Sequence, residues 1–436
     1  MGSEMCIRDR ITAARPGTEK VMTDGIATYV GVDWASVTHY AFALDPEGGK
    51  LGYKGFVHSG DGLAELVEWI RRTAAVEPGR VAIGIEVPHG PVVESLMEAG
   101  FQVYALNPKQ LDRFRDRFTV AGAKDDRRDA LVLADALRTD RQAYRLLEPM
   151  HPTIIELREW SRMTEDLSAE RNRLANRFRH QLWRYFPQVI DLAEDWASLW
   201  ILDLWDLIPT PARARTVRPE TVAKLLKRTK VRRWTADTLL EQLRSTPLIV
   251  APGVADACVA HCRVILQRLR LVIDQLRTAL KHLDRLSAAV AAIPSTDPTP
   301  PRHHDPEILQ SIPGVGPIVL AALLSEAHDA VVRRDAQALR GLSGVAPVTR
   351  RSGKQTLVIM RQSCPRRLRT AVYHWARVAV MRDFNCRNRY AALRKRGHSH
   401  ARALRSIGSR LIGVACAMLS TGELFDAARQ PQQASA

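Results

Sequence analysis

The sequence predicts an α/β domain followed by a longer, mostly helical region. Residues 28–145 alternate between short apolar runs and amphipathic segments. Residues 153–293 carry apolar side chains near heptad spacing in two long stretches. A proline-rich segment, "AAIPSTDPTPPRHHDP", then precedes a basic region with further helical spacing. With 46% hydrophobic residues, the chain has the composition of a globular protein.

The N-terminal region reads as five strands and three helices. Strands are predicted in "TYVGVDW", "THYAFALD", "KLGYKGFVHS", "RVAIGIE" and residues 102–106. Helices are predicted in "GDGLAELVEWIRRTA", residues 92–99 and "AGAKDDRRDALVLADALRTD". The order is strand, strand, strand, helix, strand, helix, strand, helix. This is the order of a ribonuclease-H-like domain.

The two long helices suit a coiled coil, either antiparallel within one chain or between chains. Their apolar positions include Trp160, Leu182, Ile265 and Leu283. On the second helix, Cys258, His261 and Cys262 share one face and could supply three zinc ligands. No fourth ligand stands out, so we interpret the two cysteines as core residues.

Charge points to a nucleic-acid partner. The net charge is +17 and the pI is about 10.0. Residues 361–411 alone hold 14 Lys and Arg and a single acid, Asp383. Such concentration favours a surface that binds phosphates, and Arg394, Lys395 and Arg396 are the predicted contacts. The six scattered cysteines and the lack of an 18-residue apolar run predict a cytoplasmic, nucleoid-associated protein that does not bind membranes.

Four acids are candidates for a metal site. Asp33 and Glu86 end two predicted strands, while Asp126 and Asp129 lie three apart and share a helix face. Acids at a helix start can simply offset its positive end. If all four converge at one sheet edge, they repel one another unless divalent cations lie between them. Mg²⁺, or Mn²⁺, is the expected ion. Asp135 falls off the shared face, and we interpret it as solvated.

The C-terminal region carries two further candidates. "SIPGVGPIVLAALLSE" places Gly314 and Gly316 between helical patterns, which suits either a helix–hairpin–helix element that grips a DNA backbone or an ordinary turn. "GLSGVAPVTRRSGKQ" places Ser352 among cations, which could bind the phosphate that it attacks. Ser343 is the competing nucleophile. The flanking cations are Arg350, Arg351 and Lys354.

Several of these stretches resemble one family. "YVGVDWAS", "IGIEVPHG", "NPKQLDRFRD" and "AKDDRRDALVLADAL" look like the N-terminal motifs of the DEDD transposases, which are bacterial insertion-sequence recombinases with a RuvC-like domain. The family's Lys-x-Asp-x-x-Asp-Ala motif matches Lys124, Asp126, Asp129 and Ala130. The stretch "EVPHG" departs from the more usual Glu-Ala-Thr-Gly-like sequence, and the middle segment is long.

The resemblance implies a catalytic tetrad of Asp33, Glu86, Asp126 and Asp129, with Ser352 as the catalytic serine. It also implies an element-encoded bridge RNA that pairs with donor and target DNA. A homo-oligomer, a dimer or a tetramer, would join the RuvC-like site of one subunit to the serine domain of another. Two other hypotheses remain open: a Holliday-junction-type nuclease that uses water and the acids alone, and a non-catalytic nucleic-acid-binding protein.

The predicted domain limits follow these patterns. Residues 1–27 are expected to be a disordered or non-native extension, and residues 426–436 a disordered tail. Between them we expect a RuvC-like nuclease domain at 28–148, a helical coiled-coil region at 149–292, a linker at 293–306 and a C-terminal transposase domain at 307–425.

Overall fold

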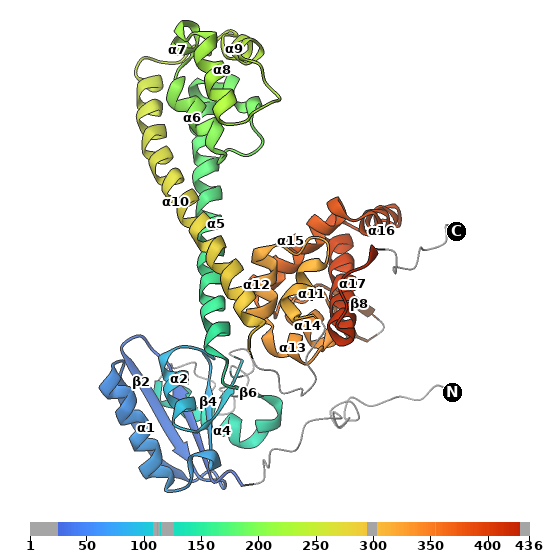
Figure 1. Cartoon of the computed structure of the whole chain (residues 1–436). Coiled ribbons are helices and arrows are strands. Elements are labelled where there is room, and N and C mark those ends of the chain that lie inside the picture. The colour runs from blue at the N-terminus through green and yellow to red at the C-terminus, as the bar shows by residue number, and fades with distance from the viewer. Residues whose placement is uncertain are drawn as a thin grey trace. The chain divides into compact units, whose positions relative to one another are not determined.

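The structure, a computed structural model, describes residues 25–107, 111, 114, 126–293, 303–353 and 355–427. The chain divides into two compact units, Met1–Pro149 and Met150–Ala436 (Figure 1). The first is mixed α/β and the second is mostly helical, as the sequence predicts. Of the predicted N-terminal extension (1–27) only residues 25–27 are described, and of the predicted C-terminal tail (426–436) only residues 426 and 427; most of the predicted linker also lies outside the described residues.

The first unit is built on a six-stranded mixed sheet with the order β3-β2-β1-β4-β5-β6. Strand β1 pairs antiparallel with β2 and parallel with β4, and β4 pairs parallel with β5. The two-residue β6, antiparallel to β5, was not predicted because it is too short to carry an apolar pattern. The strands are β1 (Thr28–Asp33), β2 (Thr38–Leu44), β3 (Lys50–Val57), β4 (Val81–Ile85), β5 (Gln102–Ala105) and β6 (Arg145–Leu146).

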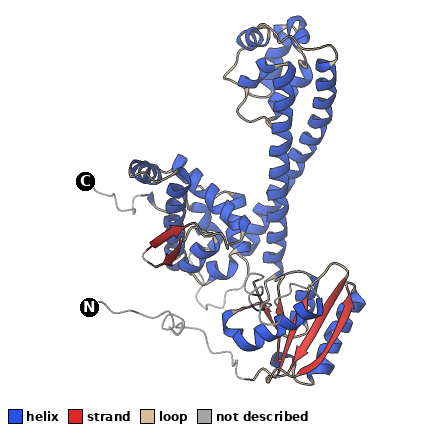
Figure 2. Cartoon of the chain, turned by 180° about the vertical axis from the view of Figure 1, so that it is seen from behind, coloured by secondary structure: helices blue, strands red, loops and turns tan. Residues whose placement is uncertain are grey.

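Helices cover both faces of this sheet (Figure 2). Helices α1 (Gly60–Ala74) and α2 (Pro91–Glu98) pack on one face, where Val30 and Val32 of β1 join their core. Helix α4 (Asp126–Asp140) packs on the other face against β1, β2 and β4. Because side chains alternate along a strand, Gly31 faces α4 while its two neighbours face α1 and α2. Short 3₁₀ turns, η2 (Pro78–Arg80) and η3 (Arg141–Ala143), complete the unit.

A pair of glycines lets α4 approach the sheet closely. Gly31 and Gly84 are neighbours in the β1–β4 register. A Cβ atom at Gly31 would lie 2.0 Å from the carbonyl oxygen of Ala130, and one at Gly84 would lie 3.2 Å from that of Leu133. Larger side chains at these two positions would force the helix away from the strands.

A contact at the C-terminal end of α4 shows in which direction the helix runs relative to β1. Arg138 donates to the carbonyl oxygen of Pro46 at 3.3 Å, in the turn after β2. That turn lies beside the start of β1, because Leu44 pairs with Tyr29. Helix α4 therefore runs antiparallel to β1, and its first residues lie toward the strand end that carries Asp33.

The interpretation of Asp135 as a solvated acid was wrong. Its side chain is buried, and its Oδ1 atom accepts hydrogen bonds from Nη2 of Arg138 at 2.6 Å and from Nε at 3.1 Å. The two residues are three apart on α4 and so lie on the same face. The carboxylate thereby holds the arginine that ties α4 to the β2–β3 turn.

The second unit contains the two predicted long helices, α5 (Pro152–Tyr185) and α10 (Val254–Val290). They pack against each other in antiparallel directions within one chain. Of the two predicted arrangements, this is the coiled coil within one chain and not the one between chains. Glu156 meets Arg285 at 3.6 Å, Glu170 meets Arg268 at 3.3 Å, and the Trp160 ring stacks on a histidine of α10 with centroids 4.1 Å apart. Since higher numbers on one helix meet lower numbers on the other, the pairing is antiparallel.

Between the long helices the chain forms a small helical core. Its elements are η4 (Pro187–Leu192), α6 (Leu199–Leu207), α7 (Pro211–Thr216), α8 (Pro219–Arg228) and α9 (Ala236–Leu243). Cys258 and Cys262 are buried in this core while His261 is exposed, and burial raises the pKa of Cys262 to about 12. Both cysteines belong to this hydrophobic cluster, which confirms their interpretation as core residues.

The C-terminal helices form a second core with the other ends of the long pair, since Leu157 and Leu283 belong to it. Helix α17 (His400–Thr421) is long and apolar enough to span a membrane, but Leu404, Ile407 and Leu411 are buried in this core, as in a core helix. The helices are α11 (Asp305–Ser311), α12 (Pro317–Glu326), α13 (His328–Val332), α14 (Ala336–Leu342), α15 (Arg366–Arg382), α16 (Phe384–Lys395) and α17 (His400–Thr421). A hairpin, β7 (Val348–Ser352) and β8 (Gln355–Ile359), follows α14.

Replacing Gly31 by Ala should destabilise the N-terminal unit by about 3 kcal/mol or more, at the upper end of overpacking effects. The reason is that the added carbon meets backbone atoms of α4, which cannot rotate away. Urea unfolding measures the loss. Gly60→Ala is the matched control, because nothing lies within 4 Å of its Cβ position. Equal stability of the two variants would contradict the close packing.

Candidate active site

Two predicted acids lie side by side at one end of the sheet. Val32 and Ile85 are register partners on the parallel strands β1 and β4, and Asp33 and Glu86 come directly after them. By alternation, Asp33 shares a face with Gly31, and Glu86 shares it with Gly84. Continued alternation would place both carboxylates on the side of the sheet that α4 covers, and both residues are partly exposed.

The third and fourth acids come from α4. Asp129 immediately precedes Ala130, whose carbonyl oxygen lies against Gly31, and its side chain is half-buried. Asp126, one turn earlier, is exposed. Because α4 runs antiparallel to β1, these first residues lie toward the edge where Asp33 and Glu86 end. The fold thus directs all four predicted acids to the same end of one face.

The donor chemistry suits a hard divalent cation, because carboxylate oxygens are the ligands that Mg²⁺ and Mn²⁺ prefer. Across the described part of the chain, however, no three acidic, histidine or cysteine side chains are close enough to form a ligand group. The backbone brings the acids to one edge without closing them into a coordination sphere. The metal-ligand roles of these acids stay predictions.

A histidine pair supports the loop after Asp33, and no sequence pattern predicted it. The N–H of Ala35 donates to Nδ1 of the buried His39 at 3.3 Å. The His39 proton must then lie on Nε2, which donates to Nδ1 of His58 at 2.8 Å. Burial lowers the pKa of His39, and His58 lowers it further. Two histidines nineteen residues apart become partners only once β2 and β3 pair.

Ser352 lies at the end of a basic hairpin. It is exposed and pairs with Gln355 across a two-residue turn, in which Gly353 has a φ of +54°. That backbone conformation favours glycine and explains the Ser-Gly sequence. Arg350 and Arg351 precede it on β7 and are exposed, while Lys354 lies outside the described residues.

Ser343, the competing serine, sits in a different environment. It is 1% exposed at the end of α14, and its hydroxyl donates to the carbonyl oxygen of Leu339 at 2.7 Å. A buried hydroxyl that is already committed to a backbone acceptor is poorly placed to attack a phosphate. The two environments favour Ser352.

The glycines of the predicted helix–hairpin–helix element differ in role. Gly314 has a φ of +91°, and a Cβ there would lie 2.9 Å from backbone atoms of Trp375 and Ala379. Packing against α15 therefore explains why glycine is needed at this position. Gly316, before α12, has nothing within 4 Å of its Cβ position. Contact of either glycine with a DNA backbone stays a prediction.

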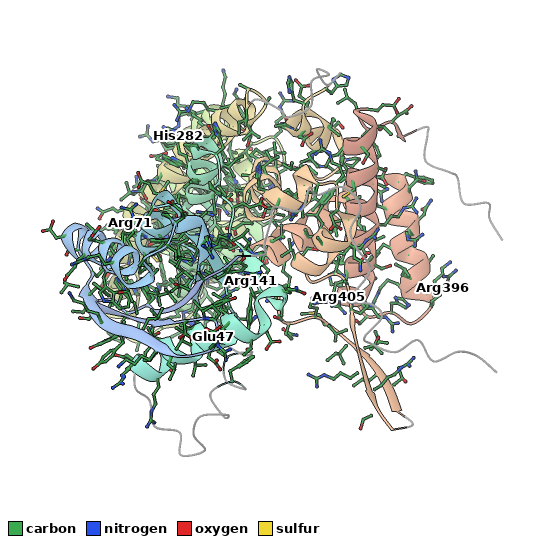
Figure 3. All side chains as sticks on the ribbon, turned by 90° about the horizontal axis from the view of Figure 1, so that it is seen from below. Glu47, Arg71, Arg141, His282, Arg396 and Arg405 are labelled. Atoms are coloured by element: carbon green, nitrogen blue, oxygen red, sulfur yellow. The ribbon has the colours of Figure 1, made fainter. Side chains whose placement is uncertain are left out.

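Arg394, Lys395 and Arg396 are exposed at the end of α16, and Arg396 points outward from the C-terminal helices (Figure 3). Asp383, the single acid of residues 361–411, is buried. Its carboxylate caps α16 by accepting a hydrogen bond from the N–H of Cys386 at 2.7 Å. It therefore does not neutralise the outer surface. The local positive charge remains available to a polyanion.

Acids gathered at a sheet edge, together with a basic surface in the same chain, are typical of enzymes that carry out phosphoryl transfer on nucleic acids. Comparison with known proteins agrees. A family model described as "Transposase" matches residues 30–187, and one described as "Transposase IS116/IS110/IS902 family" matches residues 306–392. The chain belongs to the IS116/IS110/IS902 family of transposases.

Three relatives illustrate the match. The chain is 30% identical to "Mini-circle putative transposase for IS117" of Streptomyces coelicolor, over 93% of this chain and 97% of that protein. It is 31% identical to "Insertion element IS116 uncharacterized 44.8 kDa protein" of Streptomyces clavuligerus, over 91% and 96%. It is 59% identical to "Putative transposase y4uE" of Sinorhizobium fredii, where the match spans 49% of this chain and 60% of that protein.

Replacing Arg394, Lys395 and Arg396 by Ala should weaken nucleic-acid binding and flatten its salt dependence. Each lost phosphate contact should lower the log–log salt slope by roughly 0.7–0.9. Titrations of the full chain at several salt concentrations measure the slope. The control is a variant with the same charge loss on α8, at Lys224, Lys227 and Arg228, all exposed. If both variants change the salt slope equally, the cations of α16 do not contact phosphates more than those of α8, and the prediction is contradicted.

Proposed function

We propose that this chain cuts and rejoins DNA strands during transposition of its insertion sequence. The observation that carries the proposal is the placement of Asp33 and Glu86 at neighbouring strand ends, on the face covered by α4. Family membership supports it. We assign residues 28–148 to a RuvC-like, ribonuclease-H-like domain, with Asp126 and Asp129 completing a catalytic tetrad. The sheet order β3-β2-β1-β4-β5 is the order expected for that fold.

The four carboxylates would repel one another and a DNA phosphate alike, so they work only with bound cations. Mg²⁺ or Mn²⁺ held there would help to activate the nucleophile and stabilise the leaving oxygen. The residues of the chain set the geometry. The strands place Asp33 beside Glu86. The close approach of α4 to Gly31 and Gly84 sets how near Asp129 of that helix comes to these two acids.

Ser352 is the proposed nucleophile. Its attack on a phosphodiester forms an Oγ–P bond and breaks one P–O bond of the strand, and the serine proton ends on the released oxygen. The phosphoserine link conserves the bond energy, so a strand hydroxyl can reverse the step and join a new partner. Arg350 and Arg351, exposed on the same hairpin, would bind the phosphate oxygens.

The partners follow from the same proposal. Donor and target DNA are the substrates, and resemblance to the DEDD transposases supports an element-encoded bridge RNA that pairs with both. It also supports a dimer or tetramer in which the acids of one subunit meet the serine domain, residues 307–425, of another. We place the protein in the bacterial cytoplasm, at the nucleoid.

Asp129→Asn should abolish DNA strand cleavage in the presence of Mg²⁺ and leave DNA binding nearly unchanged. The substitution removes a charge needed to hold the cation but keeps the shape of the side chain. A cleavage assay with the full chain, run alongside a binding titration, measures both effects. Asp140→Asn, an exposed acid at the other end of α4, is the control and should cleave normally. Wild-type cleavage by Asp129→Asn would remove that residue from the site.

Ser352→Ala should abolish both recombination and the covalent protein–DNA adduct, while DNA binding persists. Trapping on a nicked substrate followed by denaturing electrophoresis detects the adduct as a slow band. Ser363→Ala, an exposed serine of the same region, is the control and should keep the band.

Other outcomes identify other mechanisms. An adduct that survives in Ser352→Ala would point to another nucleophile, with Ser343 tested next. Cut DNA without an adduct in wild type and variant would mean that water attacks, as in a Holliday-junction-type nuclease. No cutting by either protein would leave a nucleic-acid-binding protein.

A further inference from the structure

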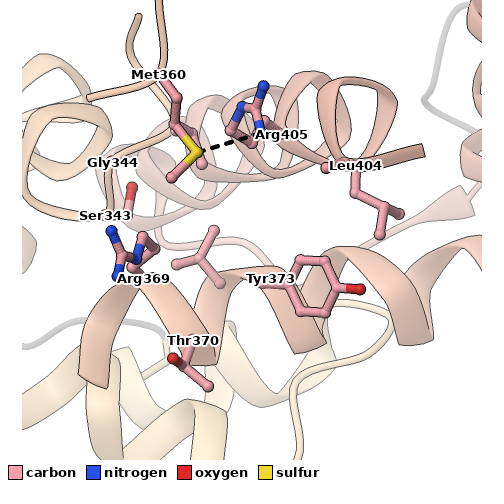
Figure 4. Close-up of a pocket in the computed structure, with 11 residues that line it drawn as sticks. Ser343, Gly344, Met360, Arg369, Thr370, Tyr373, Leu404 and Arg405 are labelled. Atoms are coloured by element: carbon pink, nitrogen blue, oxygen red, sulfur yellow. Dashed lines mark hydrogen bonds between the residues drawn. The ribbon is translucent and has the colours of Figure 1, made fainter. Parts of the chain in front are cut away.

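A cavity of about 230 Å³ lies between the end of α14, the end of β8 and the helices α15 and α17. Most of its wall is apolar, and Val345, Met360, Val372 and Leu404 contribute to it (Figure 4). Its volume is below the roughly 300–1,000 Å³ typical of pockets for drug-sized ligands. It therefore suits a single small ring system.

Two arginines line this cavity without carboxylate partners in the described part of the chain. Arg405 donates to the sulfur of Met360 at 3.4 Å, which is a weak acceptor, and Arg369 donates to Oε1 of Gln362 at 3.5 Å. Burial lowers the pKa of Arg405, and the neighbouring Arg402 lowers it further. Both guanidinium groups thus retain the capacity to bind an anion at the rim of an apolar space.

An aromatic ring completes the wall. Tyr373 of α15 lines the cavity and is 38% exposed, and Figure 4 shows its ring on the same side as Arg369, across from Arg405 and Leu404 of α17. An accessible ring beside cations is the combination that binds single-stranded nucleic acid, because every base can stack on it.

We propose that this cavity binds one unstacked nucleobase of the DNA strand, with Tyr373 against its ring and Arg369 and Arg405 on the adjoining phosphates. The proposal rests on the proposed function and adds a specific strand contact to it. It explains why the cavity combines apolar walls with arginines that have no acidic partner among the described residues: a nucleotide has an apolar ring and an anionic backbone.

The location of the cavity indicates that the bound base belongs to the same DNA strand that Ser352 would attack. Met360 directly follows β8, and Ile359 pairs with Val348 at the base of the hairpin, close to Arg405 (Figure 3). Ser352 is four residues along β7 from Val348, which spans roughly 13 Å of extended chain. Such a span is short beside the roughly 4–16 nucleotides that single-strand binding sites cover. One DNA strand can therefore reach both places.

The test compares two single strands on the full-length protein. One is a thymidine oligonucleotide of about twelve nucleotides, within the range of single-strand site sizes. The other has the same length and phosphates but abasic sugars throughout. We expect the wild type to bind the first at least about fivefold more tightly. Tyr373→Leu and the cavity-filling Ala401→Leu should bring this ratio close to one without weakening the abasic strand. Their thermal unfolding confirms that both fold.

Trp183→Leu is the control, because Trp183 is an exposed aromatic residue on α5 away from this cavity, and it should keep the wild-type ratio. A ratio of one in wild type, or an unchanged ratio in both cavity variants, overturns the proposal. If only a uridine RNA strand shows a base preference that Tyr373→Leu removes, the assignment to DNA is wrong. If the serine mechanism fails, the wild-type protein forms no covalent adduct through Ser352. That result does not affect the ratio of the two strand affinities, so the two failures can be distinguished.

Discussion

The contact between helix α4 and the glycine pair of β1 and β4 determines the geometry of the N-terminal unit. At Gly31 a Cβ atom would overlap the backbone of α4, so the helix lies as close to the strand as two backbones allow. Interiors are packed too densely for such a contact to shift without cost. The height of α4 over the sheet is therefore fixed by residues without side chains, two positions before Asp33 and Glu86.

The paired strands under this contact also place two acids, Asp33 and Glu86, at neighbouring strand ends. The strands place Asp33 and Glu86 one step beyond paired residues, so their separation is set by the hydrogen-bonded ladder. On the opposite face, the buried His39 holds the loop after Asp33 by accepting the N–H of Ala35. In the proposed metal site, the fold rather than mutual attraction of the ligands would bring the acids together.

The sequence predicted those features that depend on local pattern. Apolar runs located β1 to β5 of the N-terminal unit, and acids at the ends of the first and fourth strands pointed to the shared edge, but the β7–β8 hairpin was not predicted. Features that depend on tertiary pairing were missed. Heptad spacing is the same for antiparallel and intermolecular helices, Asp135 became buried through Arg138, and the role of Gly31 appears only when α4 packs on it. The cavity was invisible because its lining comes from four separated segments.

The contrast between Ser343 and Ser352 shows what a reactive serine requires of its surroundings. Ser343 is held by the core and its hydroxyl is occupied. Ser352 lies on a hairpin whose apolar residues Leu357 and Val358 are 60% and 59% exposed. An isolated two-stranded hairpin is marginally stable in water. Binding of a phosphate backbone to Arg350 and Arg351 would supply the missing stabilisation. The proposed nucleophile would then be ordered by its own substrate, which links attack to correct DNA binding.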